Sequence, residues 1–249
     1  AIVRVLLAQA GLDRRAGLNT AGYISGYRGS PLGNVDTALW SVKEWLAAEG
    51  IVFQPGVNED IAATAVADTQ QIDQLPGARY DGVFAAGYGK GPGVDRSGDA
   101  FKHGNYAGAH AKGGVLVFFG DYHAGKSSTV AFQSEQAIVA SSIPILYPAD
   151  PGELIEYGLF GYALSRHSAS WVSIKCVNEH RLPLIGPFFR ANRIDRAIFR
   201  GEAPRLGLVA TGHRASSASA TRRARRYSLK PYRSSPRRSR SASARCRIG

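Results

Sequence analysis

The sequence predicts an α/β fold, with a doubly wound, mostly parallel sheet followed by a disordered basic C-terminal tail. Short apolar runs recur along the first two hundred residues, and helical patterns separate them. Parallel strands need a crossover between them, usually a helix, so this alternation is typical of βαβ units. The expected strands are Ala21–Ser25, Ile51–Phe53, Gly82–Ala86, Val115–Phe119, Ile143–Tyr147 and Trp171–Cys176.

Apolar residues at helical spacing predict the crossover helices. The chain starts within an amphipathic pattern, which places a helix before the first strand. A second pattern ends before Gly50, and a third follows a Pro-Gly turn at Pro55. These two patterns consist of Val35, Leu39, Val42 and Leu46, and of Ile61, Ala62, Ala65, Val66 and Ile72.

The segments that follow the expected strands are rich in glycine and polar residues. In doubly wound folds, the loops at the carboxyl ends of the strands form the ligand site. We therefore expect four loops to share one crevice. They are Gly26–Gly33, Pro55–Glu59, Gly87–Gly98 and Gly120–Thr129.

The formal net charge of +12 belongs to the end of the chain. Residues 213–249 hold 12 Lys and Arg and no Asp or Glu, which leaves 19 basic residues against 19 acidic ones in residues 1–212. This Arg- and Ser-rich tail has too little apolar surface to offset its ordering entropy, so we expect it to be disordered. We predict one domain in residues 1–200, the start of a further domain in 201–212, and the tail in 213–249.

The tail begins abruptly inside the apolar run Leu206–Gly212, and the chain contains no Met. We therefore expect a fragment whose authentic sequence ends near Gly212, with the remainder read in a shifted frame. Only Cys176 and Cys246 are present, too few for a disulfide scaffold. There is no secretory signal and no apolar stretch near the roughly 20 residues of a membrane span. We expect a cytoplasmic protein.

Glu59 is the main candidate site residue. It follows the strand Ile51–Phe53 and a Pro-Gly turn, and it opens a predicted helix. A carboxylate at this edge of a parallel sheet can bind and tune a heterocycle. From position alone, the alternative is a first-turn acid that complements the helix dipole, worth about 0.3–1 kcal/mol.

Two other functions arise from motifs. Gly120–Ser127 fits the phosphate-loop pattern G-x-x-x-x-G-K-S and follows a predicted strand, so a nucleotide-binding protein is one alternative. Against it, the motif comes late in the chain, and no strand ends in the aspartate expected to bind magnesium. The basic tail gives a second alternative, a nucleic-acid-binding protein.

Four loop motifs, in order, resemble one family. They are Leu18–Gly33 (LNTAGYISGYRGSPLG), Phe53–Glu59 (FQPGVNE), Tyr88–Asp99 (YGKGPGVDRSGD), and Lys126–Thr129 (KSST) with Gln133–Glu135 (QSE). Together they resemble the indolepyruvate ferredoxin oxidoreductase family, within the thiamine-diphosphate-dependent 2-oxoacid:ferredoxin oxidoreductases. The resemblance covers about residues 1–212 and corresponds to the N-terminal pyrimidine-binding domain. It also implies that the phosphate-loop match is accidental.

The resemblance implies the role of Glu59. Its carboxyl group would hydrogen-bond N1′ of the thiamine aminopyrimidine and favour the imino tautomer, which takes the C2 proton of the cofactor. The resemblance also places Gly29 and Ser30 at the cofactor, where the Ser30 hydroxyl would bond either the 2-oxoacid carboxylate or the pyrimidine amine. An ordinary turn serine before proline is the alternative for Ser30.

Arg96 and His123 are further candidates for substrate binding. Arg96, like Lys90, lies in a glycine-rich segment where it could meet an anionic carboxylate or diphosphate. His123 follows a strand end and titrates near neutral pH. For Arg96 and Lys90 the alternative is a solvated loop charge, and for His123 a structural or solvated histidine.

The resemblance also defines what the chain lacks. No Gly-Asp-Gly followed by Asn, the motif that binds diphosphate and Mg²⁺ in such enzymes, appears in the sequence. Iron–sulfur clusters, coenzyme A, ferredoxin and a homo-oligomer belong to the full-length enzyme that the family implies. We therefore expect this chain alone to be inactive and to need a diphosphate-binding domain from the same or a partner chain.

Overall fold

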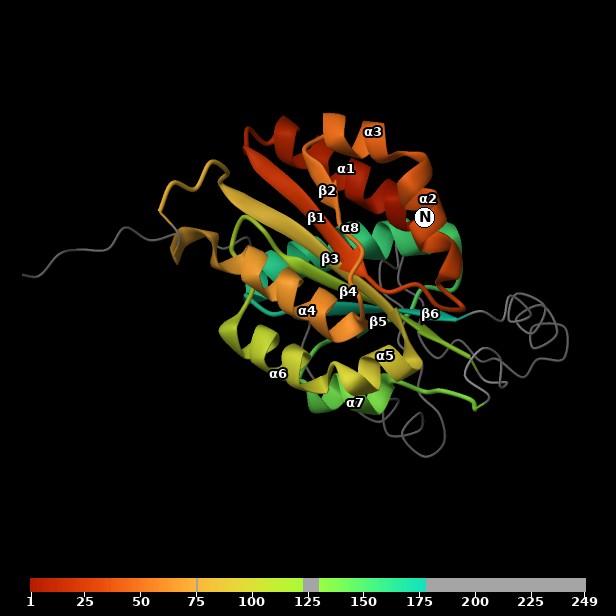
Figure 1. The fold of residues 1–249 in the computed structure, drawn as a ribbon. Coiled ribbons are helices and arrows are strands. Elements are labelled where there is room, and N and C mark those ends of the chain that lie inside the picture. Colours follow the sequence, from red (N-terminus) through yellow and green to blue (C-terminus); the bar gives the residue numbers. More distant parts are fainter. Residues whose placement is uncertain (75, 123–129, 178–249) are drawn as a thin grey trace, which may run out of the picture. The chain divides into compact units, whose positions relative to one another are not determined.

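A computed structural model of the protein describes residues 1–74, 76–122 and 130–177 (Figure 1). They all lie in the first of the two compact units of the chain, Ala1–Asn192. Their centre is a six-stranded sheet in the order β2-β1-β3-β4-β6-β5, and every neighbouring pair is parallel. The strands are β1 (Thr20–Gly26), β2 (Ile51–Phe53), β3 (Gly82–Lys90), β4 (Val115–Asp121), β5 (Ile145–Leu146) and β6 (Val172–Val177).

Helices cover both faces of this sheet (Figure 1). One face carries α1 (Ile2–Arg15), α2 (Gly33–Ser41), α3 (Lys43–Ala48) and α8 (Pro151–Ser168). The other carries α4 (Glu59–Asp68), α5 (Gly91–Arg96), α6 (Gly98–Ala107) and α7 (Glu135–Ala140), and the 3₁₀ helix η1 (Thr69–Gln74) continues α4. The predicted α/β class with a parallel sheet is confirmed.

The two faces hold separate apolar cores, because successive residues of a strand point to opposite faces. Leu116 and Phe118 of β4 pack in the core beneath α1 and α8. Val117 and Phe119 of the same strand pack in the core beneath α4 and α6. All seven residues of β4 are buried, as expected of a central parallel strand.

Local sequence accounts for the two best-defined helix starts. The Asn58 side chain caps α4 by accepting a hydrogen bond from the Ile61 amide at 2.8 Å. Asp150 caps α8 in the same way, accepting from the amides of Gly152 and Glu153 at 2.7 and 2.9 Å. A cap of this kind contributes about 1 kcal/mol to helix stability.

Two expectations need correction. The predicted loop Gly87–Gly98 is not a loop, because β3 continues to Lys90 and α5 follows from Gly91 to Arg96. Glycine is compatible with the strand here, since Gly87 and Gly89 pair in register with Val117 and Phe119 of β4. Gly120 likewise belongs to β4 rather than to a loop. The predicted domain limits at 200 and 212 and the predicted tail lie outside the described residues.

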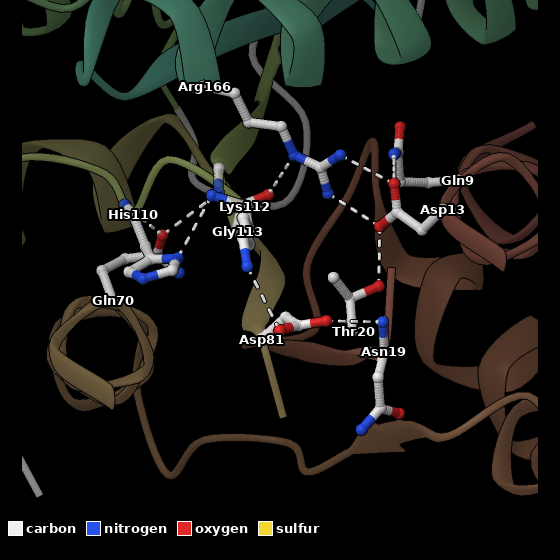
Figure 2. A network of polar contacts seen from close by, with 11 residues as sticks. Gln9, Asp13, Asn19, Thr20, Gln70, Asp81, His110, Lys112, Gly113 and Arg166 are labelled. Carbon is white, nitrogen blue, oxygen red and sulfur yellow. Dashed lines mark hydrogen bonds and ion pairs between the residues drawn. The ribbon is translucent and has the colours of Figure 1, made fainter. Parts of the chain in front are cut away.

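A polar network fixes the amino ends of the strands (Figure 2). Arg166 of α8 donates two hydrogen bonds, each 2.7 Å, to the two carboxylate oxygens of Asp13 in α1, and a third at 2.9 Å to the Gly113 carbonyl. Thr20 and Gln9 also donate to Asp13, at 2.7 and 2.8 Å. These bonds tie both helices to the starts of β1 and β4.

Candidate functional site

The connections of the sheet diverge between β1 and β3. The chain leaves β1 towards α2, on the face that carries α1, whereas it leaves β3 directly into α5, on the opposite face (Figure 1). Because β1 and β3 are neighbours, their carboxyl ends border a topological switch point, where open α/β sheets bind their ligands. The segment after Gly26 and the junction of β3 with α5 therefore flank the expected crevice.

Glu59 lies at this edge as the first residue of α4. Its residue surface is only 8% exposed, and its side chain is directed at the junction of β3 and α5. A Cβ atom on Gly93 would overlap the Glu59 carboxyl group, and one on Gly89 would lie 2.7 Å from its Cγ. Two glycines thus make the space that the carboxylate occupies.

The Glu59 carboxylate receives no hydrogen bond from a side chain in the part of the chain that the structure describes. Its oxygens are nevertheless not sealed from solvent, because neither is among the fully buried side-chain atoms that lack a partner in the described residues. A cavity of about 20 Å³ adjoins it, lined also by Ala62, Val94 and Phe101. This volume holds about one water molecule, so a heterocycle needs space from the surrounding segments.

The segment after β1 lies across the ends of β3 and β4. A Cβ on Gly29 would lie 2.7 Å from the Lys90 side chain, and one on Gly120 would lie 2.7 Å from Pro31. Gly29 and Glu59 therefore contact consecutive residues, because Glu59 packs on Gly89 and Gly29 packs on Lys90. The structure thus gathers three of the four expected segments at the end of β3.

Tyr88 of β3 holds both ends of the segment between β1 and α2. Its hydroxyl donates a short hydrogen bond to Asp36 in α2, and its ring packs on Gly26. Burial, and next the Asp36 carboxylate, raise the pKa of Tyr88, so the phenol keeps its proton. This contact fixes where the segment carrying Ser30 enters α2.

The other predicted site residues have no described contact with Glu59. Ser30 is half-buried in the segment after β1, in a cis peptide bond with Pro31. Arg96 is exposed in the last turn of α5. His123 and most of the phosphate-loop pattern lie outside the described residues. Asp121, the second residue of that pattern, is buried and accepts hydrogen bonds from the Ser134 amide and hydroxyl at 2.9 and 2.6 Å.

Sequence reasoning missed Lys175, which lies at the carboxyl end of β6. Its side chain is only 4% exposed and lies between two carboxylates, Asp121 at 3.5 Å and Glu135 in a shorter contact. Burial alone would raise the pKa of Glu135, but the hydrogen bond from Lys175 holds it below its usual value. Burial, and next the Asp121 charge, raise the pKa of Asp95 in α5. The available signal was a lysine inside an otherwise apolar strand run.

A wider hollow of about 520 Å³ lies elsewhere, between α1 and α8. Its lining includes Gln9, Asp13 and Arg166, whose polar groups are already bonded to one another. It also lies at the amino ends of the strands, opposite the expected ligand edge. We therefore assign the candidate site to the smaller space beside Glu59.

Among residues 1–74, 76–122 and 130–177, no group of three His, Cys, Asp or Glu side chains is arranged to hold a metal ion. None of the helices described is both long and apolar enough to cross a membrane. Comparisons of the chain with protein-family models and with curated proteins find no match. The functional assignment therefore depends on the motifs and on the geometry around Glu59.

Proposed function

We propose that this chain supplies the pyrimidine-binding half of a thiamine diphosphate site in a 2-oxoacid:ferredoxin oxidoreductase of the indolepyruvate type. One observation carries the proposal: Glu59 is buried at the switch-point edge, over Gly89 and Gly93, with no side-chain donor among the described residues. A carboxyl group held in this way is ready to bond a ring nitrogen that enters the crevice. The four loop motifs supply the family.

The residues present fit the pyrimidine side of this cofactor. Thiamine diphosphate, when bound, would supply a C2 carbon that attacks the 2-oxo carbon once its proton is removed, and a thiazolium ring that takes up the electron pair left by decarboxylation. The Glu59 carboxyl group lies where it would hydrogen-bond N1′, and Gly89 and Gly93 keep that position free of other side chains. Gly29 and Ser30 border the substrate end, and Arg96 is available for an anionic group. Mg²⁺ and the diphosphate belong to the partner domain.

The half-site predicts weak but specific binding. An aminopyrimidine has about ten non-hydrogen atoms, and about 0.3–0.4 kcal/mol per atom gives a dissociation constant of about 1–10 mM. We would titrate the full chain with 4-amino-5-hydroxymethyl-2-methylpyrimidine and follow backbone amide shifts by NMR. The expected shifts cluster at Glu59, Gly89 and Gly93.

Glu59→Ala should abolish these shifts, whereas Asp60→Ala, which removes the neighbouring carboxylate of the same helix, should preserve them. Shifts that persist in Glu59→Ala, or that never appear at about 10 mM ligand, would refute the proposal. The chain alone should not turn over indolepyruvate with a viologen acceptor. Turnover would refute the expected need for a diphosphate-binding domain.

The alternative of a nucleotide-binding function depends on one motif, Gly120–Ser127. The structure describes only its first three residues. Gly120 is a strand residue packed against Pro31, and Asp121 is bonded to Ser134. Both observations favour a structural role for the start of the motif. A fluorescent ATP analogue that binds the chain, but not Lys126→Ala, would support the nucleotide site instead.

A further inference from the structure

Strand β2 forms one edge of the sheet, and no described strand pairs with its outer side. Its three residues, Ile51, Val52 and Phe53, include no charged residue and no proline. Natural proteins usually protect a sheet edge with such residues, because an open edge can pair with another chain. β2 has neither of these residues, and within the strand only its short length limits pairing.

The hydrogen bonds of β2 show which of its backbone groups point outward. Gly22 donates to the Gly50 carbonyl, and Gln54 donates to the Ile24 carbonyl, both at 3.0 Å. Backbone groups alternate in direction along a strand, so Val52 also faces β1. The amides and carbonyls of Ile51 and Phe53 therefore face away from the sheet.

Large apolar side chains surround this open edge. Trp40 packs edge-on against Phe53, with ring centroids 5.1 Å apart. Val57 follows β2, Ile61 lies in the first turn of α4, and Trp45 belongs to α3, which packs on β2. The exposed fractions are 50% for Trp40, 70% for Trp45, 54% for Val52, 77% for Val57 and 52% for Ile61.

These five side chains, which we call the β2 patch, expose about 600 Å² of largely apolar surface. These side chains flank β2 on both faces of the sheet, and their summed area is near one half of a small specific interface, about 600–800 Å² per partner. The backbone of the edge strand adds polar groups that need partners. The surface thus combines enough apolar area with a set of directed hydrogen bonds.

We propose that the β2 patch binds a second copy of this chain, with the two β2 strands antiparallel about a two-fold axis at Val52. In this register, Ile51 of one copy faces Phe53 of the other, and the outward groups of each pair exchange two hydrogen bonds. Val52 faces its own counterpart on the axis. The sequence Ile-Val-Phe is thus self-complementary, as a two-fold interface requires.

The first test is the mass of the purified full chain in solution, measured by light scattering and by sedimentation at concentrations up to about 1 mM, because interfaces at the small end of the specific range can be weak. The expected result is a dimer that Val52→Lys converts to a monomer with an unchanged circular dichroism spectrum. Val139→Lys is the matched control, since Val139 is 65% exposed on α7, away from β2. A monomer at all concentrations overturns the proposal, as does a Val52→Lys dimer.

A cysteine at the axis tests the register directly. Val52→Cys, with Cys246→Ser to remove the tail thiol, should form a disulfide-linked dimer under mild oxidation. Facing Cα atoms in such a pair lie about 4.5 Å apart, within the range that a disulfide spans. Val139→Cys in the same background should form no disulfide-linked dimer. Failure of Val52→Cys to crosslink, or equal crosslinking by Val139→Cys, overturns the two-fold pairing.

Discussion

Arg166→Met isolates the ion pair that joins α8 to α1. Methionine keeps most of the aliphatic volume but removes three hydrogen bonds, two to Asp13 and one to the Gly113 carbonyl. The Asp13 side chain is only 2% exposed and keeps just the Gln9 and Thr20 donors. The variant therefore leaves a buried carboxylate without its counter-charge.

The expected loss of folding free energy is large, because the buried Asp13 carboxylate cannot replace Arg166 with water. Removing one partner of a buried ion pair costs about 3–5 kcal/mol, and the Arg166 side chain is 17% exposed, so we expect about 3 kcal/mol. For a domain of this size, 1 kcal/mol corresponds to about 2–4 °C in melting temperature, so the variant should melt about 6–12 °C lower.

The loss should depend on pH in a defined direction. Burial alone would raise the pKa of Asp13, but the hydrogen bonds from Arg166 and Thr20 hold it below its usual value. A carboxyl group with a lowered pKa stabilises the fold above its unfolded pKa, about 3.9, and loses this contribution as the pH falls through its folded pKa. The gap between wild type and Arg166→Met should therefore be full at pH 7 and narrow below about pH 4.

Urea unfolding followed by circular dichroism, at a series of pH values, measures the gap. Arg14→Met is the matched control, because Arg14 pairs with Glu49 at the surface, where its side chain is 65% exposed. An exposed pair contributes less than about 1 kcal/mol. A loss below 1 kcal/mol for Arg166→Met, or one that stays constant from pH 7 to acid, would refute this account of the network.

Three more outcomes can be measured. Gly93→Ala should displace the Glu59 carboxylate and lower the free energy of unfolding in urea by about 1–3 kcal/mol. It should also remove the pyrimidine-induced NMR shifts. Unchanged shifts would contradict the claim that Gly93 leaves room for the Glu59 carboxylate. Lys175→Met should cost about 3 kcal/mol by stranding Asp121, and a neutral result would mean that the cluster is hydrated. Burial raises the pKa of the Cys176 thiol to about 12, so iodoacetamide at pH 8 should alkylate it about 10²-fold more slowly than an ordinary thiol. Mass spectrometry of the Cys246→Ser chain measures that rate. Rapid alkylation would show that Cys176 in β6 is accessible to solvent.

Strand positions were predictable where apolar side chains mark them. The run Ile51–Phe53 matches β2 residue for residue. The end of β3 was not predictable, because Gly87 and Gly89 signal a loop locally, whereas pairing with β4 extends the strand to Lys90. The short helix α5 was missed for a similar reason, since its Gly-Pro-Gly start has poor helix propensity.

The candidate site was predictable in part. The edge of the sheet that carries Glu59 follows from chain order and the behaviour of parallel folds. The contact of Glu59 with Gly93, and that of Gly29 with Lys90, could not be deduced, because each joins segments more than 30 residues apart. Nor does local sequence show that Lys175 lies between Asp121 and Glu135, since three separate segments meet there.

The all-parallel pairing has a consequence for how the chain folds. Leu116 of β4 pairs with Val172 of β6. Strand β4 therefore gains its second neighbouring strand only after the chain has extended through α8 to β6. Contacts of such long range slow folding. A nascent chain that stops before Val172 exposes the edge of β4, whose buried residues include Phe118 and Phe119. Synthesis past β6 is thus the step after which aggregation through this strand should fall sharply.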